Sequence, residues 1–167
     1  MTRLTTLISF FLVLLSGLNA QGKVDPIMAI KQDADSVWIL SHEVTGVYIG
    51  YDDGKTKSEE RVLFKAGRLD SSLIKENHLL AKAERYQLAR LLARPNTETK
   101  IETATCFMPQ HAIIWRKAGN VSWIEVCFSC QKIRGSKNYK SAIPELDNPK
   151  WAALRSLFKQ MGMTYEL

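Results

Sequence analysis

Residues 106–130 read CFMPQHAIIWRKAGNVSWIEVCFSC, and this stretch decides the fold. Two runs rich in β-branched and aromatic residues, 111–117 and 120–128, flank the turn sequence Lys-Ala-Gly-Asn, which predicts a β-hairpin. A left-handed Gly119 would close a three-residue loop with a bulge. In that register His111 lies opposite Glu125, with Cys127 further out on the same face. A two-residue turn would send His111 to the opposite face.

The segments before the hairpin predict strands followed by a helix. Residues 36–41 and 44–51 are β-rich, 52–60 form a charged turn around Asp-Gly, and 61–67 return as a strand. An apolar stripe over about 80–94 predicts a helix that ends at a proline. Residues 99–107 then return to β character, whereas 23–35 read as a polar lead-in and 71–77 as a short turn.

The C-terminal segment carries the clearest helix signals in the chain. Asp147 or Asn148 caps a helix that has Pro149 in its first turn, and Gly162 closes it. Its apolar stripe consists of Trp151, Leu154, Leu157, Phe158 and Met161. We therefore expect an α+β fold, in which an antiparallel sheet with a central β-hairpin carries two main helices on one face.

The N-terminus predicts export. Residues 1–20 combine a basic Arg3, an apolar run and a small-residue cleavage site at Ala20, the pattern of a signal peptide. The run is shorter than the roughly 20 residues of a membrane span. Residues 21–167 then form a single domain, periplasmic or secreted.

The charge of the chain argues against a nucleic-acid partner. The net charge of +6 comes from basic residues that are scattered along the sequence, whereas nucleic-acid sites gather them on one face. The segment 132–140 reads as a solvated basic loop. A weak affinity for anionic envelope surfaces, or for a protein partner in the envelope, remains open.

The three cysteines predict a site at the open end of the hairpin. Cys106, His111, Cys127 and Cys130 form the pattern Cys-x4-His, hairpin, Cys-x2-Cys, which offers four ligands for tetrahedral zinc. Pro109 would stiffen the first half of this site. Glu125 or a backbone carbonyl would orient the free ring nitrogen of His111 from outside the ligand set.

Two other chemistries fit the same thiols. An exported chain favours a disulfide, either from Cys106 to Cys127 or Cys130, or within Cys127-x-x-Cys130. Either pairing leaves one thiol over, whereas a filled zinc site leaves none. The Cys-Phe-Ser-Cys pair also fits thiol–disulfide redox or metal handling, although redox pairs normally precede a helix. The sequence leaves these alternatives open.

The hairpin resembles one found in small exported bacterial proteins of uncharacterised function. Their pattern is Cys-Phe-x-Pro-Arg-His, a hairpin, then Ile-Cys-Phe-x-Cys, and the likeness covers about residues 80–162. It carries over Cys106, Pro109, His111, Cys127 and Cys130. This chain has Gln110 where those proteins tend to have arginine. The resemblance implies a site without implying an activity.

The expected function is therefore a non-enzymatic binding or structural role outside the cytoplasm. Trp115 and Trp123 are expected to face each other across the hairpin on the His111 side, as a packed pair or as a stacking platform for a ligand. His42, at the end of a predicted strand, is expected to be a surface or capping histidine and not a ligand.

Overall fold

The computed structural model describes residues 25–52, 55–65, 68–98, 107–136 and 145–167. The predicted signal peptide, residues 1–20, lies outside the described residues, as do Cys106 and most of the predicted 99–107 strand. Among the described residues, no helix is long and apolar enough to cross a membrane.

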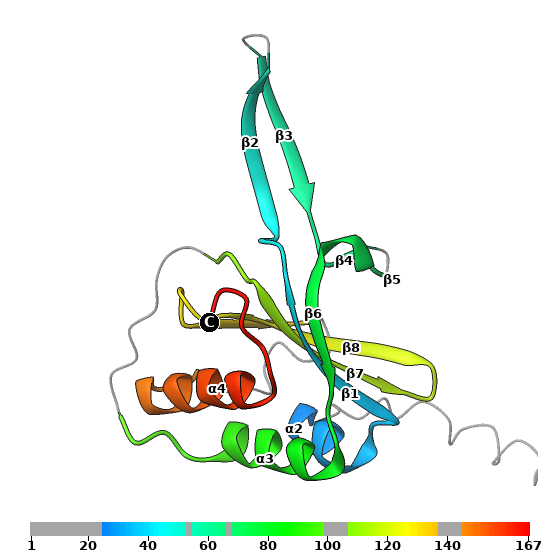
Figure 1. Ribbon diagram of the computed structural model, residues 1–167, viewed down its shortest axis with the longest axis vertical. Helices are drawn as coiled ribbons and strands as arrows, with labels where there is room; N and C mark the ends of the chain where they lie inside the picture. Colours follow the sequence, from blue (N-terminus) through cyan, green and yellow to red (C-terminus); the bar gives the residue numbers. More distant parts are fainter. Residues whose placement is uncertain (1–24, 53–54, 66–67, 99–106, 137–144) are drawn as a thin grey trace, which may run out of the picture.

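The centre of the molecule is a five-stranded antiparallel sheet (Figure 1). Its strand order is β6-β1-β7-β8-β9, so the predicted hairpin β7–β8 lies in the middle. The bounds are β1 Ser36–His42, β6 Ile74–Leu79, β7 His111–Lys117, β8 Asn120–Cys127 and β9 Lys132–Gly135. A predicted antiparallel sheet with a central hairpin is thus confirmed.

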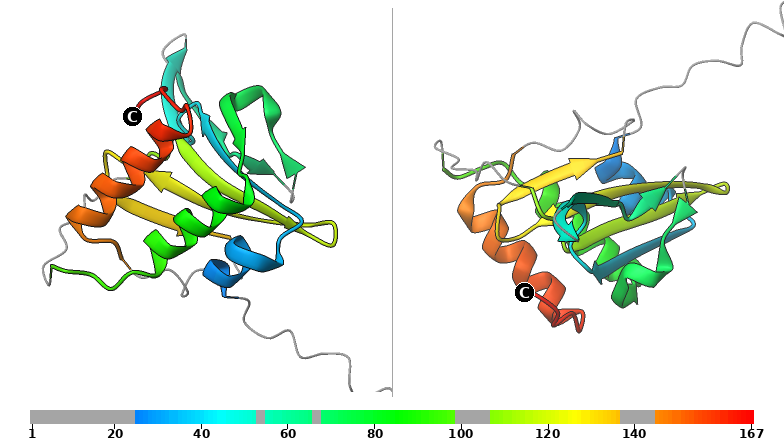
Figure 2. Two further views of the ribbon diagram at one scale, coloured as in Figure 1. Left: turned by 60° about the horizontal axis from the view of Figure 1, so that its bottom comes forward. Right: turned by 90° about the horizontal axis from the view of Figure 1, so that it is seen from above.

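Helices cover one face of this sheet (Figure 2). They are α2 Pro26–Met28, which continues as a π-helical turn over Ala29–Asp33, α3 Lys82–Ala93 and α4 Asn148–Gln160. The α4 signals are confirmed: the side chain of Asp147 accepts the N–H of Lys150, and Gly162 follows the helix with a φ of +85°. The π-helical turn buries Ile30 completely, so the prediction of a polar lead-in was wrong.

Two small ribbons extend from the sheet. β2 Gly46–Asp52 and β3 Lys55–Arg61 pair along their whole length and rise clear of the domain in Figure 1. The charged segment predicted as a turn is therefore mostly strand, because the Asp-Gly pair alone separates β2 from β3. β4 Phe64–Lys65 and β5 Arg68–Leu69 form a second, short ribbon, which we call the flap.

The register of the hairpin β7–β8 differs from the predicted one. Lys117 pairs with Asn120, so the turn has two central residues, and both Ala118 (φ 48°) and Gly119 (φ 81°) are left-handed. Alanine rarely adopts such a φ, but a two-residue turn of this hand matches the twist of the strands. The side chain of Asp35 also accepts the N–H of Ala118 at 2.8 Å.

This register sorts the residues of the sheet onto two faces. His111, Ile113 and Trp115 face the helices and belong to the main core, together with the apolar stripe of α4. Ala112 and Ile114 belong to a second, smaller cluster on the other face, with Leu40 and Leu63. We call this second side, on which the flap lies, the open face. Trp115 and Trp123 consequently lie on opposite faces, so the prediction that they pair was wrong.

Candidate functional site

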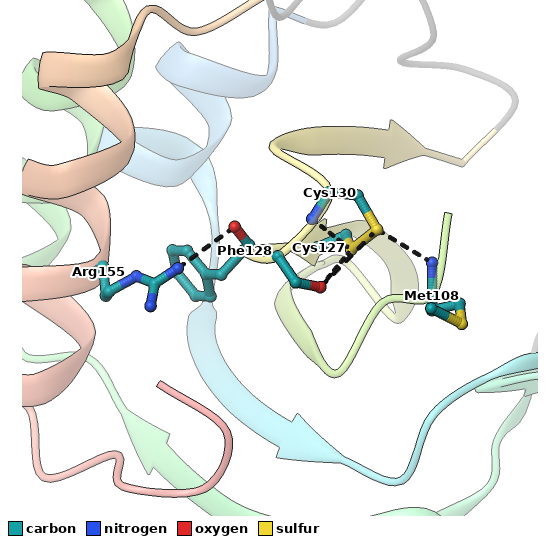
Figure 3. Close-up of a disulfide and its surroundings, with 6 residues drawn as sticks. Met108, Cys127, Phe128, Cys130 and Arg155 are labelled. Atoms are coloured by element: carbon teal, nitrogen blue, oxygen red, sulfur yellow. Dashed lines mark hydrogen bonds between the residues drawn. A yellow bond between two sulfur atoms is a disulfide. The ribbon is translucent and has the colours of Figure 1, made fainter. Parts of the chain in front are cut away.

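Cys127 and Cys130 form a disulfide in the turn between β8 and β9 (Figure 3). We call residues 127–131 the disulfide turn. Both sulfurs meet hydrogen-bond donors: the N–H of Cys130 lies 3.2 Å from Cys127 Sγ, and the N–H of Met108 lies 3.5 Å from Cys130 Sγ. Each of the two cysteines is only 1% exposed, whereas Ser129 between them is exposed. The bond therefore lies beneath the surface of the turn.

Phe128 anchors the disulfide turn in the main core. Its ring makes edge contacts with His111, Phe158 and Trp151, at centroid distances of 4.9, 5.4 and 6.0 Å. Its carbonyl accepts a hydrogen bond from the Arg155 guanidinium at 3.3 Å. Figure 3 shows Phe128 and Arg155 on one side of the turn and Met108 on the other. The turn is thus held by apolar contacts as well as by the covalent bond.

His111 lies on the helix-covered face, away from the position predicted for it. It pairs with Val126 and not with Glu125, so it faces the side of the sheet opposite to Cys127. The ring is buried, and Nε2–H donates to the carbonyl of Tyr165 at 2.9 Å. Burial lowers the pKa of His111 to about 4, although the Tyr165 carbonyl acts in the opposite direction. The ring is therefore neutral at pH 7.

Glu125 lies on the open face and does not touch His111. Arg134 donates to its Oε2 with two nitrogens, at 2.8 and 3.1 Å, and the hydroxyl of Thr45 donates to Oε1 at 3.2 Å. The backbone of Thr45 donates in turn to the carbonyl of Pro109 at 3.4 Å. Glu125 and Pro109 thus brace the segments that surround the hairpin. Of the two predicted ways to orient His111, the structure shows a backbone carbonyl, that of Tyr165.

The predicted ligand set is only partly brought together. Cys127 and Cys130 are bonded to each other, and His111 lies on the other face of the sheet. No group of three or more His, Cys, Asp or Glu side chains within the described parts of the chain could hold a metal ion. Ligation that involves Cys106 stays a prediction, because that residue lies outside the described segments.

The disulfide turn makes a prediction that thiol counting can check. With Cys127 and Cys130 bonded, unfolding without a reductant should expose one reactive thiol per chain, and peptide mapping should locate it at Cys106. A Cys106 disulfide would instead leave a thiol at Cys127 or Cys130. A zinc site would yield three thiols after chelation, and metal analysis would find the ion.

The same bond should contribute modestly to stability. The double variant Cys127→Ser/Cys130→Ser is expected to lose about 2 kcal/mol of unfolding free energy, because the closed loop is short. Urea denaturation measures this loss, and Cys106→Ser is the control that keeps the bond. A loss above about 4 kcal/mol would exceed what the chain-entropy model allows for this loop.

A groove of about 560 Å³ crosses the open face between the sheet and the flap. Every residue that lines it belongs to a strand. The lining residues are Ser36, Trp38, Leu40, Phe64, Arg68, Leu69, Ile74, Asn77, Ile114, Arg116 and Val121. Phe64 of the flap stacks on Trp123 with 4.1 Å between ring centroids, which fixes the flap on the sheet. We call this the open-face groove.

The charge of the open-face groove is one-sided. Its described lining includes Arg68 and Arg116 but no aspartate or glutamate. Both arginines are exposed, and neither guanidinium forms an ion pair or hydrogen bond with any described residue. In contrast, Arg134 is held by Glu125. The groove thus combines an apolar floor with two arginines that form no ion pair with any described residue.

The sequence reading missed this groove because it depends on long-range packing. β6 lies largely within the segment predicted as a short turn, although in the fold Ile74, Glu76 and His78 alternate with more exposed residues as in an edge strand. This alternation is one of burial in the fold, because residues 75–78 are all polar, so the sequence carries no apolar alternation that predicts β6. The flap contributes Phe64, from the segment 61–67 predicted as one continuous strand, and Arg68, which follows that segment.

His42, which was not predicted to belong to the site, lies in the interior beside Glu125. It was expected to be a surface or capping histidine but is completely buried, and its Nδ1–H donates to the carbonyl of Glu43 at 2.7 Å. Burial lowers its pKa, while the nearby Glu125 acts in the opposite direction. His42 is therefore a second neutral imidazole in the interior.

No protein-family model, curated protein or solved structure matches this chain.

Proposed function

We propose that this is an exported, non-enzymatic binding protein that holds a small amphiphile in the open-face groove. The observation that carries the proposal is the groove itself, whose volume of about 560 Å³ falls among those of small-molecule sites. The signal-peptide pattern of residues 1–20 supports export. In this proposal the disulfide turn holds β8 and β9 in place and takes no part in binding.

The floor of the groove suits an apolar chain. Trp38, Leu40 and Ile114 lie on adjacent strands on the same face, with Ile114 directly opposite Trp38. Each buried methylene contributes about 0.8 kcal/mol, so eight of them contribute roughly 6 kcal/mol before the cost of association. A neutral eight-carbon ligand should therefore bind with a dissociation constant on the order of 0.1 mM at the tightest, and more weakly once the cost of association is included.

The polar residues of the lining favour binding over catalysis. Ser36, Asn77 and the two arginines are its only polar members, and the described lining contains no histidine, cysteine or carboxylate. General acid–base or nucleophilic catalysis normally uses such groups close to the substrate. An amphiphile, by contrast, needs only an apolar floor and a polar rim.

Filling the groove tests the proposal. 1-Octanol is expected to bind the wild-type protein in isothermal titration calorimetry, with the negative heat-capacity change of apolar burial. Val121→Trp places an indole in the groove and should weaken octanol binding roughly tenfold or more, because the ring takes up the space of the chain. Tyr86→Trp, on α3 at the opposite face, is the matched control and should bind as the wild type does.

The proposal fails if octanol does not bind to the wild-type protein. It also fails if Val121→Trp, shown by its unfolding transition to be folded, binds octanol as strongly as the control does. Either result would remove the groove as the functional site.

Thiol–disulfide exchange at Cys127 and Cys130 is a second candidate. The donors around both sulfurs favour it, since an N–H that points at sulfur stabilises a thiolate after reduction. The depth of the bond opposes it, because an attacking thiolate must reach a sulfur. We therefore place the binding role first.

A further inference from the structure

We infer that the amphiphile is a carboxylate, whose head group Arg68 and Arg116 hold at the rim of the open-face groove. The inference rests on the proposed function, because it names the ligand of that same groove. It depends on three observations: the two guanidinium groups, their place relative to the apolar floor, and the kind of elements that form the rim.

The two arginines have no ion-pair partner among the described residues, in contrast to the cations that lie beside acids. Arg61 and Lys75 both pair with Glu43, Lys117 pairs with Asp33, and Arg134 pairs with Glu125. Within the described residues, Arg68 and Arg116 form no ion pair, and no acid lines the groove beside them. Two unpaired cations beside an apolar floor favour an anionic ligand over a neutral or cationic one.

The positions of these residues give the ligand a direction. Arg116 pairs with Ser36 of β1 and with Val121 of β8, near the end of the sheet where the β7–β8 turn lies. Leu40 lies four residues further along β1, and the strand then reaches the buried His42. Arg68 extends from the flap, next to Leu69, which also lines the groove. A head group at Arg116 thus leaves the apolar chain running toward Leu40.

The rim favours a carboxylate over a phosphate. All lining residues belong to strands, so the described groove has no helix N-terminus, the element that commonly binds phosphate through free N–H groups. Two guanidinium forks match the two oxygens of one carboxylate, which together offer about four lone-pair sites. The fork also explains why arginine suits this place better than lysine does.

Four ligands with the same eight-carbon chain test the head group. Octanoate, 1-octanol, octyltrimethylammonium and octyl phosphate are titrated into the full mature protein at pH 7.5 and low ionic strength. Octanoate is expected to bind roughly tenfold more tightly than octanol, and the difference should shrink at high salt. Octyltrimethylammonium should bind more weakly than octanol, because the two arginines repel it.

Variants assign the effect to the two arginines. Arg68→Gln/Arg116→Gln should remove the preference for octanoate, measured as the ratio of the octanoate and octanol dissociation constants of the same variant. Lys117→Gln is the matched control. Lys117 is the cation next to Arg116 in the sequence, but it pairs with Asp33, so this variant should keep the preference for octanoate over octanol.

The outcomes separate this inference from the proposed function. If octanol and octanoate bind equally well, or if octyl phosphate binds best, the inference of a carboxylate ligand is wrong, but binding in the open-face groove is still supported. The same holds if the double variant keeps the preference for octanoate. If none of the four ligands binds, the proposed function is wrong, and the inference of a carboxylate ligand is wrong as well.

Discussion

Phe128→Ala is expected to lower the unfolding free energy by about 3–5 kcal/mol, the usual effect of truncating a buried phenylalanine. Phe128 is 5% exposed and packs against His111, Phe158 and Trp151. The substitution leaves a cavity where the disulfide turn meets α4. Urea denaturation under non-reducing conditions measures the change, with the disulfide intact.

The comparison with the cysteine variant shows what holds the turn. The expected loss for Phe128→Ala exceeds the roughly 2 kcal/mol expected for removing the disulfide. Tyr86→Ala, which truncates an exposed ring on α3, is the control and should change the stability by about 0.5 kcal/mol or less. If Phe128→Ala costs less than removal of the disulfide, the covalent bond is the main anchor and this account is wrong.

The protein is expected to lose about 2–3 kcal/mol of stability between pH 7 and pH 4.5 through His111 alone. The pKa of His111 falls from 6.5 to about 4 on folding, first because of burial, and also because of the neighbouring His42 and Arg155; the Tyr165 carbonyl and Glu76 oppose the shift. Between these two pKa values, His111 is protonated in the unfolded chain but neutral in the folded chain. Stability is therefore complete above pH 6.5 and falls as the pH drops toward 4.

The hydrogen bonds of the ring explain why it resists protonation. Nε2–H donates to Tyr165, and Nδ1 is buried without a hydrogen-bond partner among the described residues. A second proton would therefore place a charge and an unpaired N–H in the core. His42 adds a loss of the same sign, since burial lowers its pKa as well.

Two substitutions isolate the contribution of His111. His111→Gln keeps a donor for the Tyr165 carbonyl, and His111→Phe replaces the ring with an apolar one; neither side chain titrates. Both variants should show a flatter fall in stability between pH 7 and pH 4.5, whatever their stability at pH 7. If both retain the wild-type slope, His111 is not the group that titrates.

Local signals predicted the elements whose ends are defined by their own residues. α4 is the clearest case, because Asp147, a proline in the first turn and Gly162 act within one helical turn of its ends. The existence of the hairpin β7–β8 was equally local. Its register was not, because a left-handed Ala118 is unfavourable by itself, and here Asp35, 83 residues away, accepts its N–H.

That single shift in register accounts for the errors at the predicted site. Side chains alternate along a strand, so moving the pairing by one residue turned His111 away from Glu125 and Cys127. The open-face groove escaped prediction for a related reason. Its walls come from the two strands of the flap and from four strands of the sheet, which are distant in the sequence, and no local pattern joins them.

The sequence alone determined that this chain forms an α+β domain with a central hairpin, a capped final helix and a cysteine pair spaced for a short turn. Periodicity, capping and spacing act over a few residues, so they can be read without coordinates. Only the tertiary structure decided which face each hairpin residue occupies, that Phe128 anchors the disulfide turn, and that Arg68 and Arg116 border one groove. These features depend on contacts between segments that are distant in the sequence, and a local sequence pattern does not reveal which of those contacts are favourable.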